Sequence, residues 1–225
     1  MEQFLKDPSI YTLARGPLVW IAFLVFFVGI FYRIWEVVKL AKKERIIYPY
    51  LSLKYTLRSI THWLIPYASI SMRRHPWFTI ITFVFHICLI FTPIFLLAHI
   101  ELWYESWKIR WWSLPQSIAD VMTLTVILCA ILLLIRRVIQ PDVRFLSTKG
   151  DYFALIITVL PFITGFLAHY ELLLDYKIML LIHFISGEIM LILIPFTRLS
   201  HMFLFWLIRA HTGSEFGAVR RSRDY

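Results

Sequence analysis

Five long apolar runs limit what this chain can fold into. They lie near residues 17–35, 77–100, 118–136, 152–170 and 177–199, and each is long enough to cross a bilayer as a helix. Of the 225 residues, 60% are hydrophobic, whereas a soluble domain has about 45–50% apolar residues. We therefore expect an all-α integral membrane bundle of five transmembrane helices.

The distribution of lysine and arginine predicts how the chain is oriented. Of the 23 basic residues, 18 lie on one side of the expected spans, in segments 33–74, 136–149 and 198–225. Cytoplasmic loops carry such an excess, so the N-terminus is expected outside and the C-terminus in the cytoplasm. The net charge of +9 is explained by these loops, and we expect no nucleic-acid partner.

The chain divides into a membrane domain, residues 1–212, and a polar cytoplasmic tail, residues 213–225, which we expect to fray. Within the cytoplasmic segment 36–76, leucine and isoleucine recur at helical spacing, which predicts an amphipathic helix on the inner membrane surface or under a partner. Cys88 and Cys129 lie in apolar runs and indicate neither a disulfide framework nor a metal site.

The stretch from Leu181 to Met202 is almost wholly apolar, yet it contains His183 and His201. If it is one continuous helix, 18 residues make five turns, so both imidazoles share one face about 27 Å apart. That distance is close to the thickness of a hydrocarbon core, about 30 Å. Polar side chains inside membrane helices usually have a function.

Two further histidines match these in expected depth. The second span places His86 in its inner half and His99 at its outer end, whereas the fifth span places His183 outside and His201 inside. Two antiparallel helices with imidazoles at two depths predict two haems b, bound non-covalently by two histidines each. Such sites leave no open iron position and serve electron transfer.

The outer ligand on the second span has an alternative. His99 lies 13 residues after His86 and so faces about 140° away on an ideal helix. Pro93 lies between them and is expected to kink the helix and redirect His99. His169, at the outer end of the fourth span, remains the alternative ligand.

Other residues suit the surroundings of these haems. Gly187, one turn after His183, would let a macrocycle approach, and Arg198 could pair with a haem propionate. Glu188, Glu101 and His169 are candidates for a quinone or proton site.

Three segments resemble the cytochrome b (gamma) subunit of respiratory nitrate reductase. They are "IHFISGEIMLILIPFTRLSHM" (182–202), "RRVIQPDVRFLSTKGD" (136–151) and "FHI" (85–87), and the resemblance covers about residues 77–202. It implies two b-type haems and carries over His86, His183 and His201 as ligands. That family's remaining ligand falls at Leu96 here, so His99 is not carried over directly.

The first cytoplasmic loop is also longer than in that subunit. In this respect the chain is more similar to the small cytochrome b subunit of the Hmc-, Dsr- and Tmc-type transmembrane redox complexes of sulfate reducers. This resemblance implies a prokaryotic inner membrane location. It also implies a cytoplasmic iron–sulfur partner similar to heterodisulfide reductase, a periplasmic multihaem cytochrome c, and other membrane subunits.

We expect an electron-transfer subunit of an oxidoreductase complex, not an enzyme on its own. It would relay electrons between a periplasmic cytochrome or menaquinol and the cytoplasmic iron–sulfur subunit. The alternatives are a quinol-oxidising gamma subunit and a haem-free membrane anchor. A transporter would need charges lining a path, and among the spans only Glu188 and Asp120 qualify.

Overall fold

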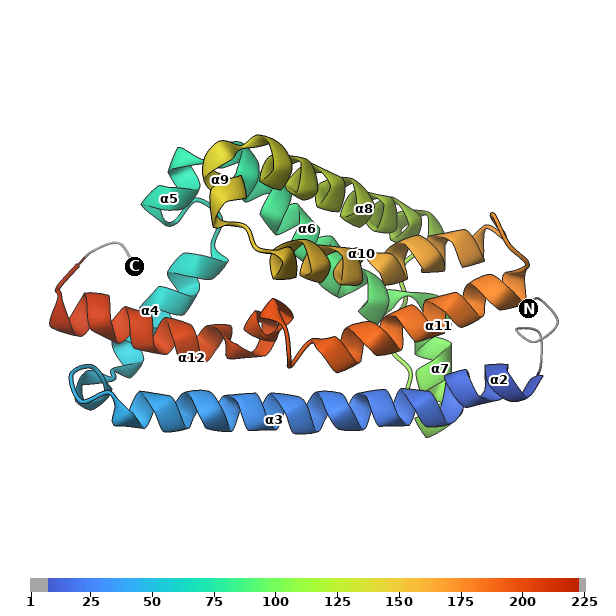
Figure 1. Cartoon of the computed structure of the whole chain (residues 1–225), viewed down its shortest axis with the longest axis horizontal. Coiled ribbons are helices and arrows are strands. Elements are labelled where there is room, and N and C mark those ends of the chain that lie inside the picture. Colours follow the sequence, from blue (N-terminus) through green and yellow to red (C-terminus); the bar gives the residue numbers. More distant parts are fainter. Residues whose placement is uncertain (1–7, 223–225) are drawn as a thin grey trace. The chain divides into compact units, whose positions relative to one another are not determined.

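A computed structural model describes residues 8–222; residues 1–7 and 223–225, at the ends of the expected domain and tail, lie outside the described part. All regular elements in the described part are helices (Figure 1). Five of these helices are long and apolar enough to cross a membrane, namely Ile10–Lys43, Pro76–Phe95, Gln116–Ile139, Lys149–His169 and Tyr176–Leu193. The predicted all-α fold with five membrane helices is therefore confirmed, whereas the orientation of the termini remains a prediction.

The first span is longer than expected and is built from three consecutive pieces. These are α2 (Pro8–Leu13), a π-helical turn η1 (Ala14–Leu18) that contains Pro17, and α3 (Val19–Lys43). The other spans are α6 (Pro76–Phe95), α8 (Gln116–Ile139), α10 (Lys149–His169) and α11 (Tyr176–Leu193).

Short helices connect or follow the spans. Between α3 and α6 lie η2 (Tyr48–Tyr50), α4 (Leu53–Leu64) and α5 (Ile70–Arg74). The segments α7 (Leu97–Trp107) and α9 (Pro141–Leu146) precede α8 and α10 respectively. After α11 come η3 (Arg198–Ser200), α12 (His201–Gly213) and η4 (Ser214–Val219).

Two sequence expectations about the fifth span and the tail are wrong. The span was expected to continue to residue 199, but α11 ends at Leu193, and His201 begins the separate helix α12. Pro195 explains the break, because proline lacks the amide hydrogen and its ring clashes with the preceding helical turn. The tail is not frayed from residue 213 on, because η4 continues the helix to Val219 and Ser214 is fully buried.

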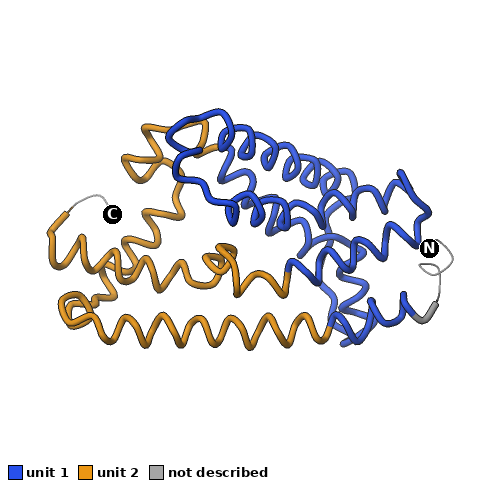
Figure 2. The backbone as a smooth tube through the Cα atoms, in the orientation of Figure 1, with its two compact units in different colours: residues 1–19, 81–190 blue, residues 20–80, 191–225 orange. Residues whose placement is uncertain are grey.

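The chain forms two compact units, which Figure 2 distinguishes by colour. Unit 1 comprises residues 1–19 and 81–190, and unit 2 comprises residues 20–80 and 191–225. In unit 1, Phe85 and Cys88 of α6 pack with Val126, Cys129 and Ala130 of α8, and α10 adds partly buried apolar side chains. This core holds α6, α8 and α10 together.

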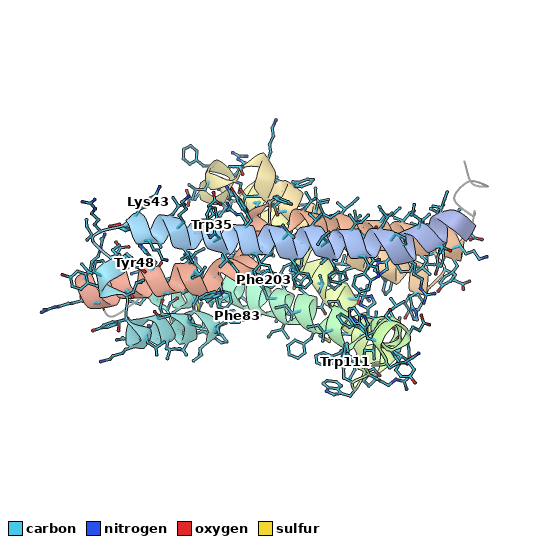
Figure 3. The ribbon with its side chains drawn as sticks, turned by 90° about the horizontal axis from the view of Figure 1, so that it is seen from below. Trp35, Lys43, Tyr48, Phe83, Trp111 and Phe203 are labelled. Atoms are coloured by element: carbon cyan, nitrogen blue, oxygen red, sulfur yellow. The ribbon has the colours of Figure 1, made fainter. Side chains whose placement is uncertain are left out.

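Unit 2 has a smaller core around the first half of α3. Phe26 and Ile30 pack with Ile194, and Phe203 of α12, labelled in Figure 3, stands edge-on to Phe26 at 5.3 Å between ring centroids. At Gly29 an added Cβ would lie 2.6 Å from Cγ of Pro195. A glycine is therefore required where α3 meets the break after α11.

The start of α10 explains part of the "RRVIQPDVRFLSTKGD" segment in structural terms. The Asp151 carboxylate accepts hydrogen bonds from the Thr148 backbone amide at 2.8 Å and from the Thr148 hydroxyl at 2.9 Å. Arg137, at the end of α8, lies 3.6 Å from the same buried carboxylate. These contacts cap α10 and fix the turn between two spans of unit 1.

Candidate functional site

The redirection of His99 begins where α6 ends. α6 ends at Phe95, two residues after Pro93, and Leu96 is extended before α7 begins. The last carbonyls of a helix have no partner within the helix, and here each finds one outside it. The carbonyl of Pro93 accepts from Nδ1 of His99 at 2.8 Å, that of Ile94 from the Trp111 indole at 2.9 Å, and that of Phe95 from the Leu114 amide at 2.9 Å.

This helix break brings His99 to His183 within unit 1. The two ring centroids lie 6.0 Å apart and the ring planes differ by 20°. The sequence predicted these residues as a pair, although an ideal continuous helix would have turned His99 away. The break between α6 and α7 supplies the change in direction that the sequence assigned to a kink at Pro93.

His183 is held by residues of α10. Its Nδ1 donates to the carbonyl of Pro161 at 3.0 Å and lies 3.4 Å from the Thr164 hydroxyl, which in turn lies 3.0 Å from the Ser186 hydroxyl. At Gly165 an added Cβ would lie 2.9 Å from Cε1 and 3.1 Å from Nδ1 of His183. Thr164, Gly165 and Ser186 were missed by sequence reasoning, because no local pattern ties them to a histidine on another helix.

All four predicted haem ligands share one hydrogen-bonding arrangement. Nδ1 of His86 bonds the Thr82 carbonyl at 2.7 Å and Nδ1 of His201 bonds the Arg198 carbonyl at 2.8 Å, as His99 and His183 bond proline carbonyls. A carbonyl only accepts, so Nδ1 carries the hydrogen in each ring, and in the neutral imidazole the lone pair lies on Nε2. Histidines that bind metals commonly have this second contact, which fixes the tautomer and the ring orientation.

The inner pair lies in two different units. His86 belongs to α6 in unit 1, where its ring stands edge-on to Phe85, and His201 belongs to the exposed start of α12 in unit 2. The pairing of His86 with His201 therefore remains a prediction. Arg198, the expected propionate partner, is exposed three residues before His201.

His169 has a different environment from His99. Its Nε2 lies 3.2 Å from Nε2 of Gln116, and the same amide nitrogen donates to Asp120 at 2.8 Å. An amide nitrogen only donates, so the lone pair on Nε2 of His169 is already engaged. The Tyr170 hydroxyl donates to the other oxygen of Asp120 at 2.8 Å. The four residues form a polar cluster at the adjoining ends of α8 and α10.

The remaining candidates are placed as follows. Both oxygens of Glu101 accept from Arg110 at 2.9 Å, so this carboxylate is engaged in an ion pair. Glu188 is buried, and its Oε1 has no hydrogen-bond partner among the described residues. At Gly187 an added Cβ would meet nothing within 4 Å, which is the open space that a macrocycle would need.

Within the polar cluster, the surroundings of Tyr170 shift the pKa of its phenol. Its hydrogen bond to Asp120 raises the pKa of the Tyr170 phenol above its ordinary value, and desolvation and the carboxylate charge act in the same direction. Loss of the phenol proton would break this bond and place two negative charges side by side. The cluster therefore holds Tyr170 neutral and donating.

Comparison with known proteins gives one informative match. No protein-family model and no solved structure matches the chain. A curated protein of Nitratidesulfovibrio vulgaris (strain Hildenborough) is 37% identical over 216 residues, which cover 94% of this chain and 95% of that protein. The chain belongs to the same family as this Nitratidesulfovibrio vulgaris protein.

Proposed function

We propose that this chain is a di-haem b membrane subunit that relays electrons between a periplasmic-side donor or acceptor and a cytoplasmic iron–sulfur subunit. The observation that carries the proposal is the His99–His183 pair, with ring centroids 6.0 Å apart and both Nδ1 atoms anchored to backbone carbonyls. Imidazole–metal bonds of about 2 Å place two rings that share one metal about 6 Å apart between centres. At this separation, His99 and His183 would together hold one iron through their Nε2 atoms.

The donor set favours haem over a metal held by protein ligands alone. Among the described residues, no group of three or more histidine, cysteine, aspartate or glutamate side chains could hold a metal ion. A haem needs only two axial ligands from the protein, because its macrocycle supplies the other four. When bound, the haem supplies one-electron redox chemistry.

The proposal gives each candidate site residue a role. His99 and His183 would hold the outer iron, with Gly165 making room for His183 and Gly187 leaving space beside it. His86 and His201 would each hold the inner iron through Nε2, since Nδ1 of each ring bonds a backbone carbonyl. Arg198, three residues before His201, is exposed and would bind a propionate.

The location and partners follow from the same proposal. Five membrane helices and a family relative in a bacterium support a prokaryotic inner membrane. The excess of basic residues favours a cytoplasmic location for segment 36–76 and the C-terminal helices, where the iron–sulfur subunit would meet them. The resemblance to Hmc-type small cytochrome b subunits supports a periplasmic multihaem cytochrome c as the other redox partner.

A second candidate function is quinol oxidation, and the polar cluster of Gln116, Asp120, His169 and Tyr170 favours it. On α10, His169 lies four residues after Gly165, so it is about one turn, or 6 Å along the axis, beyond the residue that contacts His183. The cluster thus offers titratable groups near the outer histidine pair. Inhibitor-sensitive menaquinol oxidation by the purified complex would support this function, and its absence would favour a cytochrome donor.

The first test is a haem count on the purified protein. A dithionite-reduced minus oxidised spectrum with a pyridine haemochrome assay should give two haems b per chain. A chain that shows no b-type α band after expression with haem supplied would contradict the proposal. The haem-free membrane anchor would then be the better description.

A further inference from the structure

Helix α4 of unit 2 packs against α12 through the face that carries Tyr55 and Ser59. Figure 1 shows α4 crossing α12, which belongs to the same unit. At the crossing, a Cβ added to Gly213 would lie 2.5 Å from the Tyr55 carbonyl oxygen and 2.7 Å from Cβ of Ser59, which is fully buried. Nearby, the Trp63 and Phe205 rings stack at 5.9 Å between centroids. This contact fixes which face of α4 points outward.

The outward face carries a stripe of leucines. Leu53, Leu57 and Leu64 are 73%, 53% and 53% exposed, and their spacing keeps them within about 40° of one another around the helix. Single exposed leucines are common on protein surfaces, but an aligned apolar stripe indicates a surface that is normally covered. The described residues, 8–222, do not cover it.

A basic edge runs beside the stripe. Lys54 and Arg58 are both exposed and lie about 100° around the helix from Leu53 and Leu57 respectively. Segment 36–76 contains two acidic residues, Glu36 and Glu44, and eight basic ones: Lys39, Lys42, Lys43, Arg45, Lys54, Arg58, Arg73 and Arg74. This charge opposes binding of a second copy of the same surface and complements anionic phosphates.

In the sequence, α4 lies between two membrane spans, α3 and α6. Nine residues separate the end of α3 at Lys43 from α4, and eleven residues separate the end of α4 from the start of α6 at Pro76. Figure 3 shows Trp35 and Lys43 along the last turns of α3, with Tyr48 following. Tryptophan and tyrosine are enriched at membrane–water interfaces, and lysine is common in the adjoining cytoplasmic loops, so α4 follows a segment with interfacial character.

We propose that α4 is an interfacial helix that binds anionic phospholipid. Leu53, Leu57 and Leu64 enter the boundary between headgroups and acyl chains, and Lys54 and Arg58 contact the lipid phosphates. Only nine residues separate the apolar stripe from the end of the membrane span α3, and the basic edge matches the headgroup charge. The inference requires only the membrane helices, so it is independent of haem binding.

The test places a fluorophore on the stripe. Leu57→Cys, labelled with nitrobenzoxadiazole, is reconstituted into vesicles of phosphatidylcholine with phosphatidylglycerol, some of whose lipids carry a spin label on the acyl chain. Cys88 and Cys129 are buried in the core of unit 1, so they should react little with the label. The chain without an added cysteine is treated in the same way to measure this background labelling. Asp142→Cys, at an exposed residue of α9 that has no role in the proposal, is the control.

The expected result is a shorter emission wavelength and stronger quenching at position 57 than at position 142. Water-like emission without quenching at position 57 would overturn the proposal and assign the stripe to a protein partner instead. Vesicles of phosphatidylcholine alone should reduce the quenching at position 57. Equal quenching in both lipid mixtures would refute the role of anionic headgroups.

Discussion

Replacing Gly165 by alanine tests whether His183 needs the exact space that this glycine leaves. The added methyl would lie 2.9 Å from Cε1 of His183, whereas ordinary contact begins at 3.4 Å, so the ring must move by about 0.5 Å. That movement pulls Nδ1 away from the Pro161 carbonyl, now 3.0 Å distant. Overpacking of this kind costs about 1–3 kcal/mol, which corresponds to about a 5- to 150-fold loss of affinity if it opposes haem binding.

The assay is a haem titration of the purified variant, with redox potentiometry of the haem that remains. Gly165→Ala should lose or weaken one haem and retain the other, because His86 and His201 do not contact this glycine. Gly150→Ala is the control on the same helix, since its Cβ would meet only the Thr148 hydroxyl at an ordinary 3.6 Å. Two haems with unchanged potentials and affinity in Gly165→Ala would refute the reasoning. A circular dichroism melt checks that the variant folds.

Three further predictions concern the same region. His99→Ala should reduce the haem count from two to one while His169→Ala retains both, because the Nε2 lone pair of His169 is already bonded; the reverse result in a pyridine haemochrome assay would make His169 the ligand. Gly187→Leu should exclude the outer haem without lowering the melting temperature, since nothing lies within 4 Å of its Cβ position and leucine forms helices better than glycine; a normal haem count would show that the macrocycle lies elsewhere. Because the bond to Asp120 raises the pKa of Tyr170, Asp120→Asn should let its phenol ionise at lower pH; the phenolate difference spectrum against Tyr170→Phe measures this, and an unchanged titration would contradict the hydrogen bond.

The membrane spans were predictable because their signal is local. A helix that crosses a bilayer must be apolar along its length, so composition alone locates it to within a few residues. The ends were less predictable. α3 runs on to Lys43, eight residues past the apolar run, and α11 ends at Leu193, before the run does. Lysine-rich turns outside the bilayer can extend a helix, and Pro195 can end one inside it.

The outer histidine pair was predictable only in part. Depth matching suggested His99 with His183, but an ideal helix would have placed His99 on the wrong face. The backbone conformation at Leu96 and three carbonyl acceptors after Pro93 set its direction. These contacts join residues of α6 to α7 and to the loop before α8, and no local pattern reports them.

The sequence predicted α4 as an amphipathic helix whose apolar face lies on the membrane surface or under a partner. The contact that leaves this face exposed was not visible in the sequence. Close packing of Gly213 against Tyr55 and Ser59 covers the opposite face of α4 and leaves the leucine stripe outside. Only the fit between two backbones decides which face of such a helix is covered.

The sequence by itself determined that this chain has five membrane helices, a basic set of loops on one side, and histidines at two expected depths. These properties can be read from each segment alone, because the lipid or water around a segment limits which residue types occur in it. The tertiary structure decided that His99 meets His183, that Gly165 makes room for the ring, and that the lone pair of His169 is engaged elsewhere. Those outcomes depend on contacts of a few ångströms between distant residues, and such distances exist only after the helices have packed.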